Sequence, residues 1–173
     1  MYDRNKLSNL QKGYTLAEFI IYAGLLSALL LIMSSAFASV VATQNEAKSY
    51  SSVDEDARYI MAKMAYDFQS TNGADTVNNH IDLPATGSTS ATLQVTLNSV
   101  SYTYSVASGN LQLTANAAPE NLNSIDTSIS NVSFQRIGNG THDSVRMSFT
   151  VTSKARQTSG SKTKSFQTTL AFP

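Results

Sequence analysis

The feature that most constrains this chain is an uncharged, largely apolar run near its N-terminus, residues 19–41. As an α-helix, such a run rises about 35 Å at about 1.5 Å per residue. That length is enough to cross a hydrocarbon core of about 30 Å. A helix that is apolar on every face must be covered by lipid or by other protein. We therefore predict that residues 14–42 form a transmembrane helical segment.

The charges that precede the run predict its orientation. Arg4, Lys6 and Lys12 are opposed there only by Asp3. Because positive residues stay on the cytoplasmic side, we expect a cytoplasmic N-terminus and an exported C-terminus in a single-pass membrane protein. A cleaved secretory signal is the alternative, since "SSAFASV" contains an Ala-x-Ala arrangement at residues 36–38.

Helical periodicity continues beyond the apolar run, which favours an uncleaved segment over a secretory signal. No proline interrupts residues 14–72, and Gly73 is a typical residue to end a helix. We therefore expect one helix over residues 14–72, whose second half, 43–72, is amphipathic. Its apolar stripe follows spacings of three and four residues: Val53, Ala57, Ile60, Met61, Met64, Ala65 and Phe68.

Charged residues of the second half are expected on the solvated faces of the helix. Asp54 with Arg58, and Lys63 with Asp67, have the i,i+4 separation of surface ion pairs. The acids of "DEDA", residues 54–56, point in different directions on a helix, so we interpret them as a solvated face and not as a calcium site.

After Gly73 the hydrophobic period changes to two, which predicts antiparallel strands. Tight turns are expected at Asn98-Ser99 and at Ser108-Gly109. The apolar face of this single predicted sheet, within residues 73–173, needs a cover, and the amphipathic helix is the only substantial one. The fold class is thus α+β, with residues 43–173 as the exported domain and a helix–sheet core that includes Val53, Ile60, Met64 and Phe68. The predicted strands are "ATLQVTLN", "VSYTYSVA", "NLQLTA", "ISNVSFQRI", "SVRMSFTVTS" and "KSFQTTLAF".

Neither the composition nor the remaining polar motifs indicate a catalytic site, a metal site or a cofactor. The formal net charge is zero, which does not suggest nucleic acid, and no cysteine is present for a thiolate metal site. His142, Asp143 and Ser144 are adjacent in a predicted hairpin loop, and adjacent residues cannot face one another as a catalytic triad requires. His80 is interpreted as a solvated strand residue. We therefore expect that the protein is not an enzyme.

The segment Gly13-Tyr14-Thr15-Leu16-Ala17-Glu18, followed by the apolar run, resembles the N-terminal signal of type IV pilins and pseudopilins. The resemblance implies that a prepilin peptidase removes residues 1–13 as a cytoplasmic leader, cutting between Gly13 and Tyr14, and methylates Tyr14. It also implies a long helix on an antiparallel sheet. Thr15, Leu16 and Glu18 would then serve assembly, with Glu18 pairing with the Tyr14 amine of a neighbouring subunit.

The departures from the family pattern indicate which subtype of pilin the chain resembles. Tyr14 stands where Phe is usual, Ser35 occupies the position of a proline that kinks many major pilins, and a C-terminal cysteine pair is absent. These departures favour a minor pilin or pseudopilin. The segment "ARYIMAKMAYDFQS", residues 57–70, is similar to minor pseudopilins of the J type.

Two functions remain open at this point. The first is a structural subunit of a type IV pilus or secretion pseudopilus, whose partners are other subunits, the prepilin peptidase, an inner-membrane assembly platform and, before assembly, the lipid bilayer. After assembly it would be part of an extracellular or periplasmic filament. The second is a monomeric, membrane-anchored extracellular domain for binding or adhesion. Gly13 and Glu18 favour the first, because a plain tether needs neither residue.

Overall fold

The computed structural model describes residues 14–69, 79–115, 118–138, 143–155 and 160–171. The chain divides into two compact units, residues 1–42 and residues 43–173. Every buried hydrophobic residue of the described chain lies between Val53 and Leu170. The second unit therefore contains a complete hydrophobic core of its own.

One α-helix, α1 (Leu16–Gln69), belongs to both units. Its first half is rich in Ala, Leu and Ile, and the prediction of a single uninterrupted helix is confirmed over these residues. Hydroxyl groups within the apolar half bond to the helix backbone: Ser27 Oγ donates to the carbonyl of Ala23, and Ser35 Oγ to that of Ile32, each at 2.8 Å. Gly73, the predicted helix stop, lies outside the described residues.

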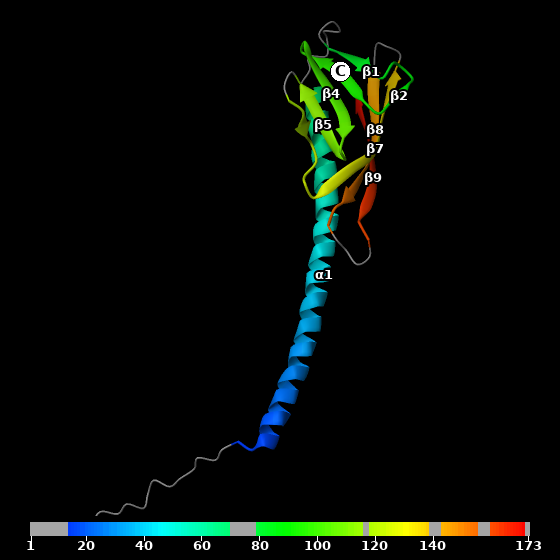
Figure 1. The fold of residues 1–173 in the computed structure, drawn as a ribbon. Coiled ribbons are helices and arrows are strands. Elements are labelled where there is room, and N and C mark those ends of the chain that lie inside the picture. The colour runs from blue at the N-terminus through cyan, green and yellow to red at the C-terminus, as the bar shows by residue number, and fades with distance from the viewer. Residues whose placement is uncertain (1–13, 70–78, 116–117, 139–142, 156–159, 172–173) are drawn as a thin grey trace, which may run out of the picture. The chain divides into compact units, whose positions relative to one another are not determined.

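In the described residues, nine strands follow α1, all paired antiparallel. A five-stranded sheet has the order β1-β3-β4-β5-β6, and a four-stranded sheet has the order β2-β7-β8-β9 (Figure 1). The strands are β1 (His80–Leu83), β2 (Thr89–Ser90), β3 (Leu93–Leu97), β4 (Val100–Ala107), β5 (Asn110–Ala115), β6 (Glu120–Asn121), β7 (Thr127–Gly138), β8 (Asp143–Ser153) and β9 (Thr163–Ala171).

The expectation of a single sheet is wrong, because the predicted strands divide between two sheets after β5. Alternating hydrophobicity identifies the residues that share one face of a strand, but it does not identify which strands pair. The two sheets are nevertheless joined. The N–H of Ile129 donates to the carbonyl of Gly109 at 2.8 Å, and Arg136 Nη1 donates to the carbonyl of Ile81 at 2.9 Å.

Both predicted tight turns are present. Asn98 and Ser99 have φ of 52° and 65° between β3 and β4, and Ser108 and Gly109 have φ of 52° and 76° between β4 and β5. A two-residue hairpin loop with positive φ at both positions is the type I′ turn, whose twist matches that of the flanking strands. These turns fix the register of three consecutive strands.

The core joins the amphipathic part of α1 to both sheets, so the predicted α+β class with a helix packed on antiparallel strands is confirmed. Val53, Ile60, Met64 and Phe68 are at most 1% exposed and lie in one cluster with strand residues of both sheets. In Figure 1 this part of α1 runs behind β4 and β5. On β3, Leu93, Val95 and Leu97 alternate inward as predicted. Val100, Tyr102, Tyr104 and Val106 alternate along β4, and of these only Tyr104 is fully buried.

The solvated helix face predicted for Asp56 and Asp67 is wrong, because both side chains are buried. Asp56 Oδ2 accepts hydrogen bonds from the N–H and Oγ of Ser124, at 3.0 and 2.8 Å, and from Oγ1 of Thr127. Asp67 Oδ2 accepts one from the hydroxyl of Tyr104 at 2.7 Å. Each acid lies three residues from a core position, so the helical period places it at the margin of the apolar stripe.

Candidate functional site at the N-terminus of the helix

The first turn of α1 is closed by Thr15 and Glu18. The N–H of Thr15 donates to Oε2 of Glu18 at 2.9 Å, and the N–H of Glu18 donates to Oγ1 of Thr15 at 3.2 Å. The Thr15 hydroxyl also lies 3.2 Å from Glu18 Oε2. This reciprocal pair is a capping box, which satisfies backbone donors that the helix itself leaves without acceptors. Glu18 therefore has a role within its own chain.

The capping box occupies only part of the hydrogen-bonding capacity of Glu18. Both bonds that Glu18 accepts fall on Oε2, and Oε1 accepts none from the described residues. An ionised carboxylate has about four acceptor positions on its two oxygens. Its negative charge also lies at the helix N-terminus, where the helix dipole favours an anion. The carboxylate can therefore accept a further donor without losing the cap.

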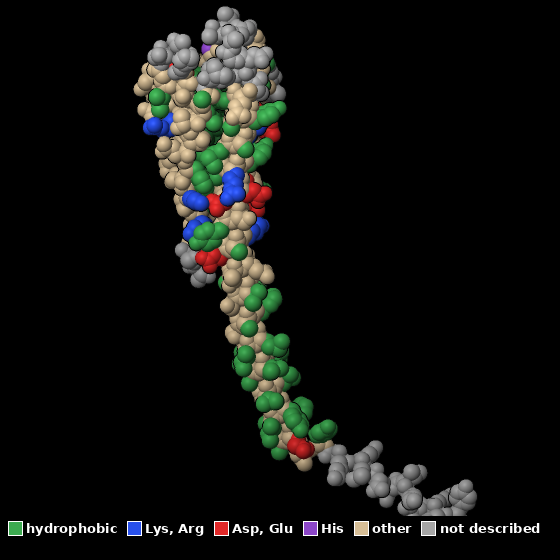
Figure 2. Space-filling model, turned by 180° about the vertical axis from the view of Figure 1, so that it is seen from behind, with side chains coloured by type: hydrophobic (Ala, Val, Ile, Leu, Met, Phe, Trp, Pro, Cys, Tyr) green, Lys and Arg blue, Asp and Glu red, His purple; other side chains and the backbone are tan. Residues whose placement is uncertain are grey.

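Large apolar side chains surround this turn and continue along the helix without cover in the chain itself. Tyr14 is 82% exposed and Leu16 is 78% exposed, and the rings of Tyr14 and Tyr22 meet edge to face at 6.3 Å. Residues 14–48 are all exposed, and Figure 2 shows hydrophobic side chains along this part of α1. The helix is long and apolar enough to cross a membrane, with a mean hydropathy of 2.3 in its most apolar window.

The structure brings together some of the predicted site residues and leaves others undescribed. Thr15 and Glu18 are in direct contact, and Leu16 is the first residue of α1. Tyr14, the predicted methylation position, immediately precedes this turn. Gly13 and the rest of the predicted leader, residues 1–13, lie outside the described residues. The cleavage and methylation sites therefore stay predictions.

Residues considered for other chemistry have structural partners. Asp54 binds Lys164 of β9 at 2.8 Å rather than Arg58, and the hydrogen bond from Lys164 lowers the pKa of Asp54, with a smaller contribution from Arg58. The predicted pair of Lys63 with Asp67 is present. His80 is an exposed strand residue, as predicted, and contacts Asp82. Within the described part of the chain, no group of three or more potential ligands could hold a metal ion.

The loop assignment is wrong for Asp143, which begins β8, whereas Ser144 lies in this strand, in agreement with the predicted strand over residues 144–153. Asp143 is buried and accepts a hydrogen bond from Nε of Arg136 at 2.9 Å. The strand begins one residue before the predicted segment, and this ion pair lies where the end of β7 meets the start of β8. His142 lies outside the described residues.

Sequence reasoning missed the capping box, although its signal was present. Thr15-Leu16-Ala17-Glu18 has the spacing Thr-x-x-Glu directly before an apolar run, which is typical of a helix N-terminus. The pattern explains why an acid lies beside so apolar a segment even in an isolated chain. Comparison with known proteins adds no constraint, since no protein-family model, curated protein or solved structure matches the chain.

Proposed function

We propose that this chain is a structural subunit of a filament of the type IV pilus or pseudopilus class, anchored and assembled through the first half of α1. The observation that carries the proposal is the combination of an uncovered apolar helix with a capped carboxylate, Glu18, at its N-terminal end. The apolar residues 19–41 need a nonpolar environment, which a bilayer supplies before assembly and neighbouring helices supply afterwards.

Glu18 would act in both states of such a subunit. In a membrane, its bond to the N–H of Thr15 compensates part of the cost of a carboxylate near hydrocarbon. In a filament, Oε1 would receive the α-ammonium group of Tyr14 from the next subunit. A charge-assisted pair in a region with little water is a strong directional contact. It would set the axial position of each incoming subunit.

Cleavage between Gly13 and Tyr14 creates the ammonium group that this pairing requires. Mass spectrometry of the protein from its host should show loss of residues 1–13 and an added methyl group on the amine of Tyr14. Gly13→Val should leave an uncleaved precursor in the membrane fraction, because the peptidase must bind extended backbone at this position. An assembled protein that retains Met1, or that is cleaved near Ala38, would contradict the proposal.

The alternative of a monomeric, membrane-anchored binding domain makes a different prediction. A domain that is only tethered to the membrane does not require removal of residues 1–13. Under this alternative, the protein should not be recovered in the sheared-filament fraction. Immunogold labelling of filaments from the native host distinguishes the two functions directly. Neither the filament function nor the binding function assigns a catalytic role to any of the described residues.

A further inference from the structure

The turn between β6 and β7 carries the most exposed large hydrophobic side chain of the described residues. Ile125 is 88% exposed, more than any large hydrophobic residue of α1. It lies at the second position of a tight turn, in which the N–H of Thr127 donates to the carbonyl of Ser124 at 3.5 Å. Buried Asp56 accepts hydrogen bonds from both ends of this turn. Ile125 is therefore held outward by a turn that is attached to the buried side of α1.

Lysine side chains surround this turn, and contacts connect them into one surface. Lys48 of α1 pairs with Asp126 at 3.4 Å, and the N–H of Lys154 donates to the carbonyl of Asp126 at 2.8 Å. Lys154 directly follows β8, and Lys162 directly precedes β9. Lys162 donates to the hydroxyl of Tyr50, and its ammonium group lies 3.9 Å from the centre of the Tyr50 ring. We define the interfacial rim as Lys48, Tyr50, Ile125, Lys154 and Lys162.

Two of the three lysines of the interfacial rim have no acidic partner. Lys48 has one, but among the described residues no acid pairs with Lys154 or Lys162. In the sequence, residues 153–171 contain no acid, and residues 42–50 contain one. Lysines beside a membrane are attracted to anionic headgroups, and the attraction falls off within a Debye length of about 8–10 Å. The rim therefore has positive charge available for such headgroups.

The interfacial rim begins close to the end of the apolar run. Lys48 follows Val41 by seven residues of the same helix, and seven residues rise about 10 Å. The headgroup layer adds about 5–8 Å on each side of the hydrocarbon core. If residues 19–41 occupy that core, as the proposed function requires, Lys48 lies just outside the headgroups and within a Debye length of their charges.

The length of the apolar run favours an inclined helix. Its rise of about 35 Å exceeds a hydrocarbon core of about 30 Å, and a span that is too long tilts in the bilayer. Tilt brings one side of the exported end of the helix nearer to the headgroups, and interfacial lysine and tyrosine residues determine which side. The interfacial rim has this composition, since it joins three lysines to Tyr50, which is 45% exposed. Lysine is in contrast depleted from interfaces between proteins.

We propose that the interfacial rim rests on the exported face of the membrane before assembly, with Ile125 inserted among the headgroups and with Lys154 and Lys162 bound to lipid phosphates. The partner is an anionic lipid surface. The inference rests on the membrane anchoring in the proposed function, but it does not depend on filament formation. It concerns the subunit while its apolar run is still in the bilayer.

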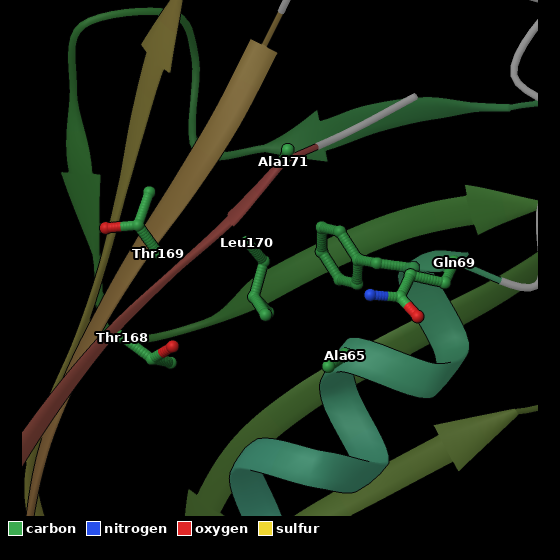
Figure 3. Close-up of a pocket in the computed structure, with 7 residues that line it drawn as sticks. Ala65, Gln69, Thr168, Thr169, Leu170 and Ala171 are labelled. Atoms are coloured by element: carbon green, nitrogen blue, oxygen red, sulfur yellow. The ribbon is translucent and has the colours of Figure 1, made fainter.

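Two positions on β9 can report the approach of the interfacial rim to lipid. Thr163 follows Lys162, and Thr169 lies six residues further along the strand, about 20 Å away. Both are exposed, and Thr169 points away from α1 beside the cavity that residues 168–171 line (Figure 3). Because the native chain has no cysteine, Thr163→Cys and Thr169→Cys each accept a single fluorophore. In lipid nanodiscs that hold one full-length chain each, nitroxide-labelled headgroups should quench the label at 163 more strongly than the label at 169.

Substitutions in the interfacial rim show whether the rim itself makes the contact. Measured at position 163, Lys154→Gln should lower the ratio of docked to undocked domain about fivefold, the effect of one lysine at an anionic surface. Ile125→Ser should lower it about tenfold, because an apolar side chain returns to water. The matched controls are Arg146→Gln, on an exposed position of β8, and Ile137→Ser, near the far end of β7, which should leave the ratio unchanged. Glu46→Gln removes the acid one helical turn before Tyr50 and should raise the ratio.

The lipid composition and the number of chains in each disc complete the test. Quenching at 163 should be strong with phosphatidylglycerol and weak with phosphatidylcholine alone. Equal quenching in the two lipids, or quenching that Ile125→Ser and Lys154→Gln leave unchanged, would overturn the proposal. So would quenching that needs two chains in one disc, because the rim would then be a contact between subunits. These results would leave the filament function intact, whereas a chain that does not enter the disc would contradict the membrane anchoring in both proposals.

Discussion

At the scale of single residues, two buried carboxylates attach α1 to the strands. Asp56 binds Ser124, which lies between β6 and β7, and Thr127, which begins β7. Asp67 binds Tyr104 of β4. The sequence places both acids at the margin of an apolar stripe, but the stripe alone does not reveal the polar groups that meet them. Those groups lie 37 to 71 residues away in sequence, which no local pattern reports.

Asp56→Ala should lower the stability of the 43–173 fragment by about 2–3 kcal/mol, because three donors lose a charged acceptor in a buried position. Urea unfolding measures the change. The matched control is Asp54→Ala, two residues earlier on the same helix, which removes only an exposed ion pair with Lys164. If the two variants lost equal stability, the buried hydrogen bonds of Asp56 would contribute no more to the free energy of unfolding than the exposed ion pair of Asp54.

Tyr104 should make the fragment sensitive to high pH. Burial, reinforced by its hydrogen bond to Asp67, raises the pKa of the Tyr104 hydroxyl. An unfolded tyrosine ionises near pH 10, so above about that pH the unfolded chain releases a proton that the folded chain retains. Stability from this group is thus complete below pH 10 and declines as the pH rises further.

Tyr104→Phe should remove that part of the alkaline loss and should also lower stability at pH 7, by about 1.5–3 kcal/mol for one lost hydrogen bond to a charged group. Thermal unfolding between pH 7 and 11 measures both effects. Tyr66→Phe is the control, since Tyr66 is 70% exposed. A Tyr104→Phe profile parallel to the wild-type profile would show that another group causes the alkaline loss.

At the scale of elements, the sequence predicts the helix, the longer strands and two tight turns, because each depends on neighbours a few residues apart. It does not predict β1, β2 and β6, which are short and lack a visible alternation. The division into two sheets depends on pairings between distant segments. The capping box at Thr15 and Glu18 was within reach of sequence reasoning, whereas the interfacial rim follows only from contacts between distant segments.

Met64→Asp should unfold the fragment, or lower its stability by several kcal/mol, because it buries an unpaired charge at a position with 0% exposure. Ala62→Asp is the matched control, with the same charge introduced two residues away on an exposed position of α1. Circular dichroism during thermal unfolding separates the two variants. A Met64→Asp fragment with the wild-type melting temperature would contradict the packing of α1 on the sheets.

At the scale of the whole molecule, the two units have opposite requirements. Residues 43–173 bury their apolar side chains among themselves, whereas the described residues of the first unit, 14–42, leave theirs exposed. The first unit therefore depends on lipid or on other chains, and the second does not. This division is compatible with the proposed filament subunit, whose exported domain would keep its structure while its N-terminal segment moves from a bilayer to a filament.

Glu18→Gln tests the assembly role that we propose for the first unit. Glutamine also serves as the last residue of a capping box, so the helix start should be preserved while the charge is lost. Cleavage after Gly13 and membrane insertion should proceed, but the neutral amide attracts a neighbouring ammonium group far less in a region of low dielectric constant. Processed subunits should therefore collect in the membrane, with little protein in sheared filaments.

Thr15→Ala supplies the complementary control for that experiment. It removes the hydroxyl that accepts from the Glu18 N–H, at a cost of about 1 kcal/mol to the helix start, and retains the carboxylate. If the charge drives assembly, Thr15→Ala should form filaments and Glu18→Gln should not. If helix capping is the only role of Glu18, the order reverses, because glutamine still caps whereas alanine does not. Comparing filament yields of the two variants therefore separates pairing between subunits from a purely local role of the carboxylate.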